Sequence, residues 1–170
     1  MNFDEWLKTV PVEITADALW QMTLYRQALF LGEVAWRDVS ALVQDQRTLR
    51  VADQLYRAVG SISANIAEGY SKASGKDQAR FYEYALGSAR EARDWYYKSR
   101  HILGEEIALH RMKLTVHIIR QLLKLVPEHR GRRLGEETAD YEILSVERLL
   151  ANIPLPPHTQ YALRTTEYVQ

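Results

Sequence analysis

The segment TLRVADQLYRAVGSISANIAEG, residues 48–69, carries the spacing that decides the fold class. Its larger apolar residues recur at steps of three and four, at Ala52, Leu55, Val59, Ile62 and Ile66. This spacing places one apolar stripe on one face of an α-helix, whereas a β-strand needs a period of two. We predict a helix over residues 48–69 that buries this stripe and ends at Gly69 in a left-handed cap.

Three other segments, residues 17–43, 76–103 and 105–126, show the same spacing, and none shows a period of two. Short connections between long helices make consecutive helices antiparallel. The sequence therefore predicts an all-α fold, an antiparallel up-down four-helix bundle over residues 17–126.

The ends of these helices carry recognisable signals. Thr15 or Asp17 can cap the first helix, and Ser74 followed by Asp77 resembles a capping box at the start of the third. Gly104 ends the third helix and Pro127 the fourth.

Two flanking regions complete the predicted organisation. Residues 1–16 form an acidic N-terminal segment. Residues 127–170 form a C-terminal extension, with a charged linker, a short helix over residues 141–150 and a turn-rich tail.

Composition narrows the class of protein. The 170 residues contain no cysteine, which excludes disulfides and thiolate metal sites. The N-terminus lacks the basic and apolar regions of a signal peptide, and the longest apolar run is too short to cross a membrane. We expect a soluble, cytoplasmic protein without a membrane partner.

Charge is balanced overall but unevenly distributed. Residues 46–133 carry 17 Lys and Arg against 9 Asp and Glu, whereas residues 1–45 carry 3 against 7 and residues 134–170 carry 2 against 6. A basic middle of this kind either binds a polyanion or is neutralised by the acidic ends.

The first and third predicted helices each have a second apolar stripe beside the main one. Four bulky aromatic residues lie on these outer stripes, namely Trp36, Phe81, Tyr84 and Trp95. A monomer rarely leaves so much aromatic surface uncovered. We expect either the terminal segments or, preferably, another subunit to cover them.

Two linked motifs resemble a known family. The second predicted helix reads SISANIAEG at residues 61–69, and the third reads ALGSARE at residues 85–91. Both are similar to signatures of the four-helix-bundle family of 23S rRNA intervening-sequence proteins, over residues 17–126. The motif residues shared with that family, which we expect to be structural, are Ser61, Asn65, Glu68, Gly69, Gly87, Ser88 and Glu91.

The resemblance implies a homo-oligomer, a pentameric ring, and a distant similarity to the accessory protein of diversity-generating retroelements. It does not imply an enzyme, and we expect no cofactor and no small-molecule substrate. Some relatives are encoded inside inserts of ribosomal RNA genes, so RNA or a ribonucleoprotein is the expected partner. The neutral net charge departs from that of an ordinary RNA-binding protein.

The motif residues allow two interpretations. Asn65 and Glu68 lie on one side of the second helix, with Ser61 on the same flank, and Glu91 of the third helix can face them. They form either a small polar pocket or an inter-helix hydrogen-bond network that sets the helix register.

The fourth helix and the linker after it carry a basic face. Its cations are Lys113, Arg120, Lys124, Arg130, Arg132 and Arg133, and His110 and His117 accompany them. Such a face contacts phosphates in some proteins and is merely solvated in others.

Two catalytic or metal-binding sites can be compared with this sequence, a ribonuclease pair and a di-iron site. Arg111 and His117 have the R-x5-H spacing of HEPN ribonucleases, but six residues turn a helix by about 600°, which separates the two side chains by about 120°. No Glu-x-x-His pair is present, so a di-iron site is not expected. The favoured function is a non-enzymatic oligomeric scaffold or binding module, with a HEPN-like ribonuclease or a purely structural oligomer as alternatives.

Overall fold

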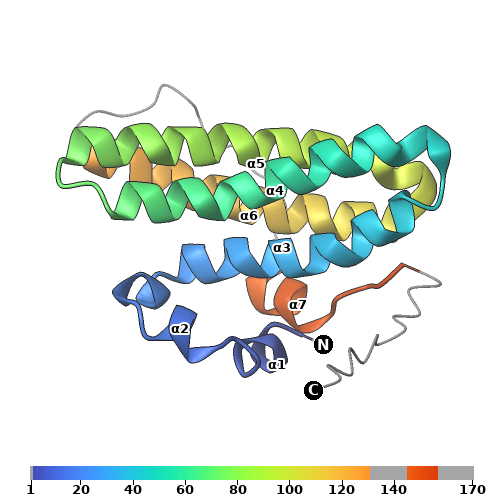
Figure 1. The fold of residues 1–170 in the computed structure, drawn as a ribbon, viewed down its shortest axis with the longest axis horizontal. Helices are drawn as coiled ribbons and strands as arrows, with labels where there is room; N and C mark the ends of the chain where they lie inside the picture. The colour runs from blue at the N-terminus through green and yellow to red at the C-terminus, as the bar shows by residue number, and fades with distance from the viewer. Residues whose placement is uncertain (1, 131–144, 157–170) are drawn as a thin grey trace, which may run out of the picture.

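The computed structural model describes residues 2–130 and 145–156, and within these ranges the chain forms helices and no β-strand. The all-α prediction is confirmed. Four long helices lie side by side (Figure 1). They are α3 (Thr23–Leu42), α4 (Leu49–Tyr70), α5 (Gly75–Leu103) and α6 (Glu105–Arg130).

Five short elements flank these helices: α1 (Phe3–Leu7), α2 (Val12–Thr15), η1 (Ala18–Gln21), η2 (Gln46–Thr48) and α7 (Val146–Ala151). In Figure 1, α1, α2 and α7 lie on the side of α3 that faces away from α5. Helix α7 contacts both α6 and α1, so the two ends of the described chain meet there. It overlaps the short helix expected over residues 141–150, of which residues 141–144 lie outside the described residues.

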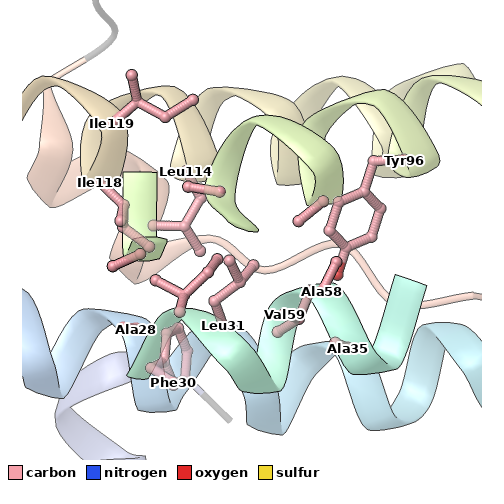
Figure 2. Close-up of a cluster of buried hydrophobic side chains, with 14 of the residues drawn as sticks. Ala28, Phe30, Leu31, Ala35, Ala58, Val59, Tyr96, Leu114, Ile118 and Ile119 are labelled. Carbon is pink, nitrogen blue, oxygen red and sulfur yellow. The ribbon is translucent and has the colours of Figure 1, made fainter. Parts of the chain in front are cut away.

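The apolar stripes of the four helices form one shared core (Figure 2). Leu31 of α3, Val59 of α4, and Leu114 and Ile118 of α6 are completely buried. Burying one such side chain contributes about 1.5–3 kcal/mol. The predicted stripe of residues 48–69 is buried along its whole length.

The N-terminal segment joins this core instead of standing apart from it. Phe3 and Trp6 of α1 are buried, and their rings lie 5.1 and 5.3 Å from that of Phe30 on α3. Asn2 and Glu5 cap α1 reciprocally, which fixes the entry of the chain.

The caps of α5 agree with the sequence. The Asp77 N–H donates to Ser74 Oγ at 3.1 Å, and the Ser74 hydroxyl donates to the Asp77 carboxylate at 2.7 Å. At the other end Gly104 has φ +86°, a left-handed conformation that favours glycine.

Three predicted helix ends are wrong. Asp17 does not begin the first long helix: its carboxylate caps the separate η1 turn, and the extended backbone of Met22 interrupts the helix before Thr23. Helix α4 continues one residue past Gly69, and its cap, Ser71, has an ordinary right-handed conformation.

The third wrong end is Pro127, which α6 passes through before ending at Arg130. Contacts with α5 hold this last turn in place despite the hydrogen bond that proline forgoes. The Arg130 guanidinium donates to the Glu83 carboxylate at 2.8 Å, and the His129 ring packs edge-on against Tyr82.

Candidate functional site

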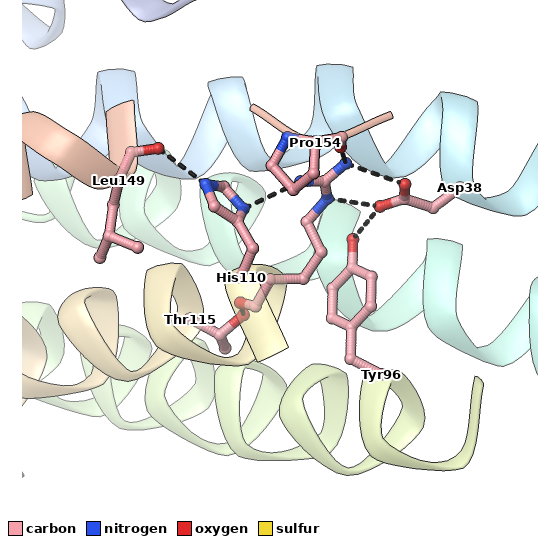
Figure 3. Close-up of polar contacts among 7 residues, drawn as sticks. Asp38, Tyr96, His110, Thr115, Leu149 and Pro154 are labelled. Atoms are coloured by element: carbon pink, nitrogen blue, oxygen red, sulfur yellow. Dashed lines mark hydrogen bonds and ion pairs between the residues drawn. The ribbon is translucent and has the colours of Figure 1, made fainter. Parts of the chain in front are cut away.

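A fully buried polar cluster lies where α3, α5 and α6 meet, and segment 145–156 covers it (Figure 3). Asp38 comes from α3, Tyr96 from α5, and His110 and Arg111 from α6. The side chains of Asp38 and Arg111 are 0% exposed. A charge pair this deeply buried is tolerated only when further hydrogen bonds satisfy both charged groups.

These polar residues occupy core positions of their helices. Asp38 continues the buried row of Leu31, Ala35 and Leu42, and Arg111 stands between Ala108 and Ile118 in the buried row of α6. Local helical geometry thus directs the carboxylate and the guanidinium into the same layer of the core.

The Asp38 carboxylate is saturated with donors. Arg111 donates to it twice, from Nε at 2.8 Å and from Nη2 at 3.1 Å, and the Tyr96 hydroxyl donates at 3.1 Å. Burial raises the pKa of Asp38, and the paired guanidinium and the hydroxyl oppose that rise. Burial and the neighbouring Asp38 together raise the pKa of Tyr96 well above its ordinary value, so the hydroxyl remains a donor.

The protonation state of His110 follows from its neighbours. Arg111 Nη1 lies 2.9 Å from His110 Nδ1, and a guanidinium can only donate, so Nδ1 accepts. The ring proton is therefore on Nε2, which donates to the Leu149 carbonyl at 2.8 Å. Burial and the adjacent positive charge of Arg111 lower the pKa of His110 to about 4, which keeps the ring neutral.

The C-terminal segment supplies the acceptors that α6 lacks. The Pro154 carbonyl accepts from Arg111 Nη2 at 2.8 Å, and the Leu149 carbonyl accepts from His110. The Leu149 side chain is buried against α6. Segment 145–156 thus seals the cluster from solvent and leaves the polar groups of Arg111 occupied by the protein itself.

Beside this seal lies an open groove of about 630 Å³. His110, Lys113 and Glu106 of α6 line one side, and Asn152 and Pro154 line the other. Across the described residues, no group of three or more His, Asp and Glu side chains is arranged to hold a metal ion.

Arg111 and His117, the two residues of the HEPN-like ribonuclease alternative, do not contact each other through the Arg111 guanidinium. The Arg111 guanidinium contacts Asp38, His110 and Pro154, and His117 is not among its partners. His117 is half-buried further along α6, where burial, and then Arg120 and Lys124, lower its pKa. A nuclease role for Arg111 would require the C-terminal segment and the ion pair to open first.

The motif residues make bonds along their own helices. The Asn65 amide donates to the Ser61 carbonyl at 2.8 Å, and Glu68 pairs with Lys72 at 3.1 Å. On α5, Ser88 donates to the Tyr84 carbonyl, and Glu91 accepts from the Trp95 indole. None of these bonds joins α4 to α5, so the structure supports neither the polar pocket nor the inter-helix network.

Gly69 is the motif residue with a clear inter-helix role. A Cβ atom there would lie 2.8 Å from Tyr82 Cε1 and 3.1 Å from Phe81 Cβ on α5. Its function is close approach of α4 to α5 and not the left-handed cap that the sequence suggested.

The basic face is only partly as predicted. Lys113 and Arg120 are half-buried and Lys124 is exposed, all on α6. Arg130 is engaged with Glu83, and His110 points into the buried cluster, so its assignment to this face is wrong. Arg132 and Arg133 lie outside the described residues.

The outer aromatic residues remain accessible in the isolated chain. Trp36 is 51% exposed and Tyr84 is 53% exposed, while Phe81 and Trp95 are half-buried. The described parts of the terminal segments lie next to α3 and α6 (Figure 1), and Trp36 and Tyr84 stay exposed.

Comparison with protein families supplies the identification. The model of the 23S rRNA-intervening sequence protein family matches residues 21–130. The chain belongs to this family. The match contains all four side chains of the buried cluster but ends before Leu149 and Pro154, whose carbonyls complete it. Comparisons with curated proteins and with solved structures give no match.

The sequence missed this cluster although a signal was present. Asp38, Tyr96 and Arg111 each interrupt an otherwise apolar helical row. A carboxylate, a hydroxyl and a guanidinium at core positions of three helices are most economically explained by mutual pairing.

Within the described residues, every helix is too short or too polar to cross a lipid bilayer.

Proposed function

We propose that this member of the family is a non-enzymatic scaffold: an antiparallel four-helix bundle of α3–α6 that assembles into a homo-oligomer, a pentameric ring, and contacts RNA or a ribonucleoprotein. The exposure of Trp36 and Tyr84 on the outer faces of α3 and α5 carries this proposal. A fully buried aromatic side chain covers about 150–250 Å², and roughly half of that area remains exposed on each of these two residues, so covering it favours assembly.

The use of the buried polar groups supports the non-enzymatic part. Catalytic groups must reach a substrate, and here Arg111, Asp38 and Tyr96 are satisfied by one another and by the chain's own carbonyls. Their arrangement serves the stability and register of the helices.

The RNA part rests on charge. Lys113, Arg120 and Lys124 follow one another along α6, and the last two are close enough to His117 to lower its pKa. Cations in such a row neutralise phosphates and release counterions. The family's description associates it with 23S rRNA intervening sequences, which makes RNA the polyanion to test first.

Light scattering on the purified protein tests the assembly. We expect a mass near that of five chains of 19.7 kDa each. A single-chain mass at micromolar concentration would refute the oligomeric scaffold.

A gel-shift titration with single-stranded RNA at several salt concentrations tests the binding. If each chain makes three phosphate contacts, the logarithm of the binding constant should fall with the logarithm of the salt concentration with a slope of about −2. Lys124→Glu should weaken binding several-fold, and Lys8→Glu, outside the basic face, should not. Absence of binding at low salt would remove RNA from the proposal and leave a structural oligomer.

A further inference from the structure

A hollow of about 410 Å³ lies on the outer face between α3 and α4. Gly32 and Gly60 line it, together with Trp36, Tyr56 and Glu33. The rings of Trp36 and Tyr56 meet edge-on at 5.7 Å, and both side chains are exposed. The hollow is within the size range of binding pockets and has an aromatic wall and one carboxylate.

The glycines of this hollow have no packing role inside the chain. A Cβ atom at Gly32 or Gly60 would meet no atom within 4 Å, in contrast to Gly69. A glycine inside a helix costs about 1 kcal/mol relative to alanine. Because the isolated chain gains nothing from that cost, the open space is better explained by something that approaches the α3 and α4 backbones from outside.

A ridge on α5 has the complementary shape. Tyr84 projects from it, packed edge-on against Phe81 at 5.6 Å. Gly87, three residues further on the same side, again has open space where a side chain would be. The Arg80 guanidinium, which also lies 3.9 Å from the Asp77 carboxylate, is over the Phe81 ring at 5.4 Å, and Lys72 Nζ is over the same ring at 4.5 Å, so the ridge carries cations beside its aromatic rings.

We propose that the α5 ridge around Tyr84 seats in the α3/α4 hollow of a second copy of this chain. The projection meets a recess, the glycines on both surfaces let the helices approach closely, and Arg80 of the ridge matches Glu33 of the hollow. This inference rests on the proposed oligomer and specifies how it forms.

The two surfaces differ and lie on different helices: in Figure 1, α5 runs along one edge of the four-helix layer and α3 along the other. Each copy therefore offers its ridge to one neighbour and its hollow to another. Head-to-tail contacts of this kind give a ring when the rotation between neighbours closes and a filament when it does not, whereas one self-complementary surface gives a dimer.

Two single variants and their mixture test the pairing. Gly60→Gln fills the hollow with a helix-forming side chain and leaves the ridge intact. Tyr84→Glu places a charge on the ridge and leaves the hollow intact. We expect each variant alone to be monomeric by light scattering, with unchanged helical content by circular dichroism, and their equimolar mixture to form a dimer of two chains.

The control is Leu109→Glu, which changes an equally exposed apolar residue on α6 and should assemble like the unmodified protein. If Gly60→Gln misfolds, Gly32→Gln replaces it. Variants that remain assembled would overturn this pairing while leaving the oligomeric scaffold standing. Monomeric variants that fail to combine would also overturn it, because the mixture contains an intact ridge and an intact hollow that should then pair. A monomeric unmodified protein would instead refute the proposed function itself.

Discussion

Two sides of this molecule differ in how they are covered: one is closed by the chain's own C-terminal segment, and the other exposes aromatic side chains. On the side of α3 and α6, the chain covers its own charged core with segment 145–156, whose carbonyls complete the Asp38–Arg111 cluster. On the α3/α4 and α5 faces, it leaves Trp36 and Tyr84 half exposed above open glycines. The same architecture thus has one surface closed by its own chain and another on which aromatic side chains stay exposed, which is the surface we propose for assembly.

The difference lies in what each side can tolerate in water. A buried ion pair without its partners is strongly destabilising, and here each chain completes the cluster with its own carbonyl groups. Exposed aromatic side chains are merely unfavourable, and a neighbour can cover them later. We therefore expect substitutions on the closed side to affect folding and substitutions on the open side to affect the proposed assembly.

The largest expected effect comes from breaking the closed side. Asp38→Ala leaves the Arg111 guanidinium buried without a counter-charge, which should lower the free energy of unfolding by about 3–5 kcal/mol. Urea denaturation followed by circular dichroism measures it. Glu68→Ala is the matched control, because it removes the exposed pair with Lys72 and should cost about 0.5 kcal/mol or less. Equal losses in the two variants would show that the cluster is not sealed in solution.

A smaller effect comes from titrating His110. Its pKa is about 4 in the folded chain, below the ordinary 6.5, so the unfolded chain binds more protons between these values. The free energy of unfolding should therefore fall as pH drops, by about 1–2 kcal/mol between pH 7 and pH 5.

Denaturation curves of the unmodified protein and of His110→Gln at both pH values isolate this contribution. The variant removes the titrating ring, so its stability should change less over the same interval. His117, whose pKa is also lowered by burial, remains in both proteins and cancels in the comparison. An identical pH dependence in both would mean that the ring is hydrated and that the C-terminal segment does not stay closed.

The sequence predicted the closed side's apolar framework but not its polar centre. Stripes such as that of residues 48–69 depend only on helical period, which one sequence displays directly. The partners Asp38 and Arg111 lie 73 residues apart, and their pairing depends on how three helices and the C-terminal segment come together. Spacing along α6 alone therefore indicates an R-x5-H pair for Arg111 and a surface position for His110.

Helix ends that depend on local backbone could be predicted from the sequence, whereas ends that depend on contacts with another helix could not. Ser74 and Gly104 act through their own local backbone, and both were predicted correctly. Pro127 was expected to stop α6, but contacts of His129 and Arg130 with α5 carry the helix past it. Gly69 likewise looked like a local cap, and its actual constraint is the Tyr82 ring of another helix.

The smallest effect compares a glycine packed against another helix with a glycine that faces open space. Gly69→Ala places a methyl group 2.8 Å from the Tyr82 ring, so it should lower the free energy of unfolding by about 1–2 kcal/mol. Gly87→Ala has open space and improves helix propensity, so it should raise the free energy of unfolding by about 0.5–1 kcal/mol at concentrations where light scattering reports single chains. At concentrations where copies assemble, the added methyl group lies in the proposed contact and should weaken association. If Gly87→Ala stabilises the chain equally at both concentrations, the α5 face is open in the oligomer as well, and the contrast between a closed and a partnered side fails at this residue.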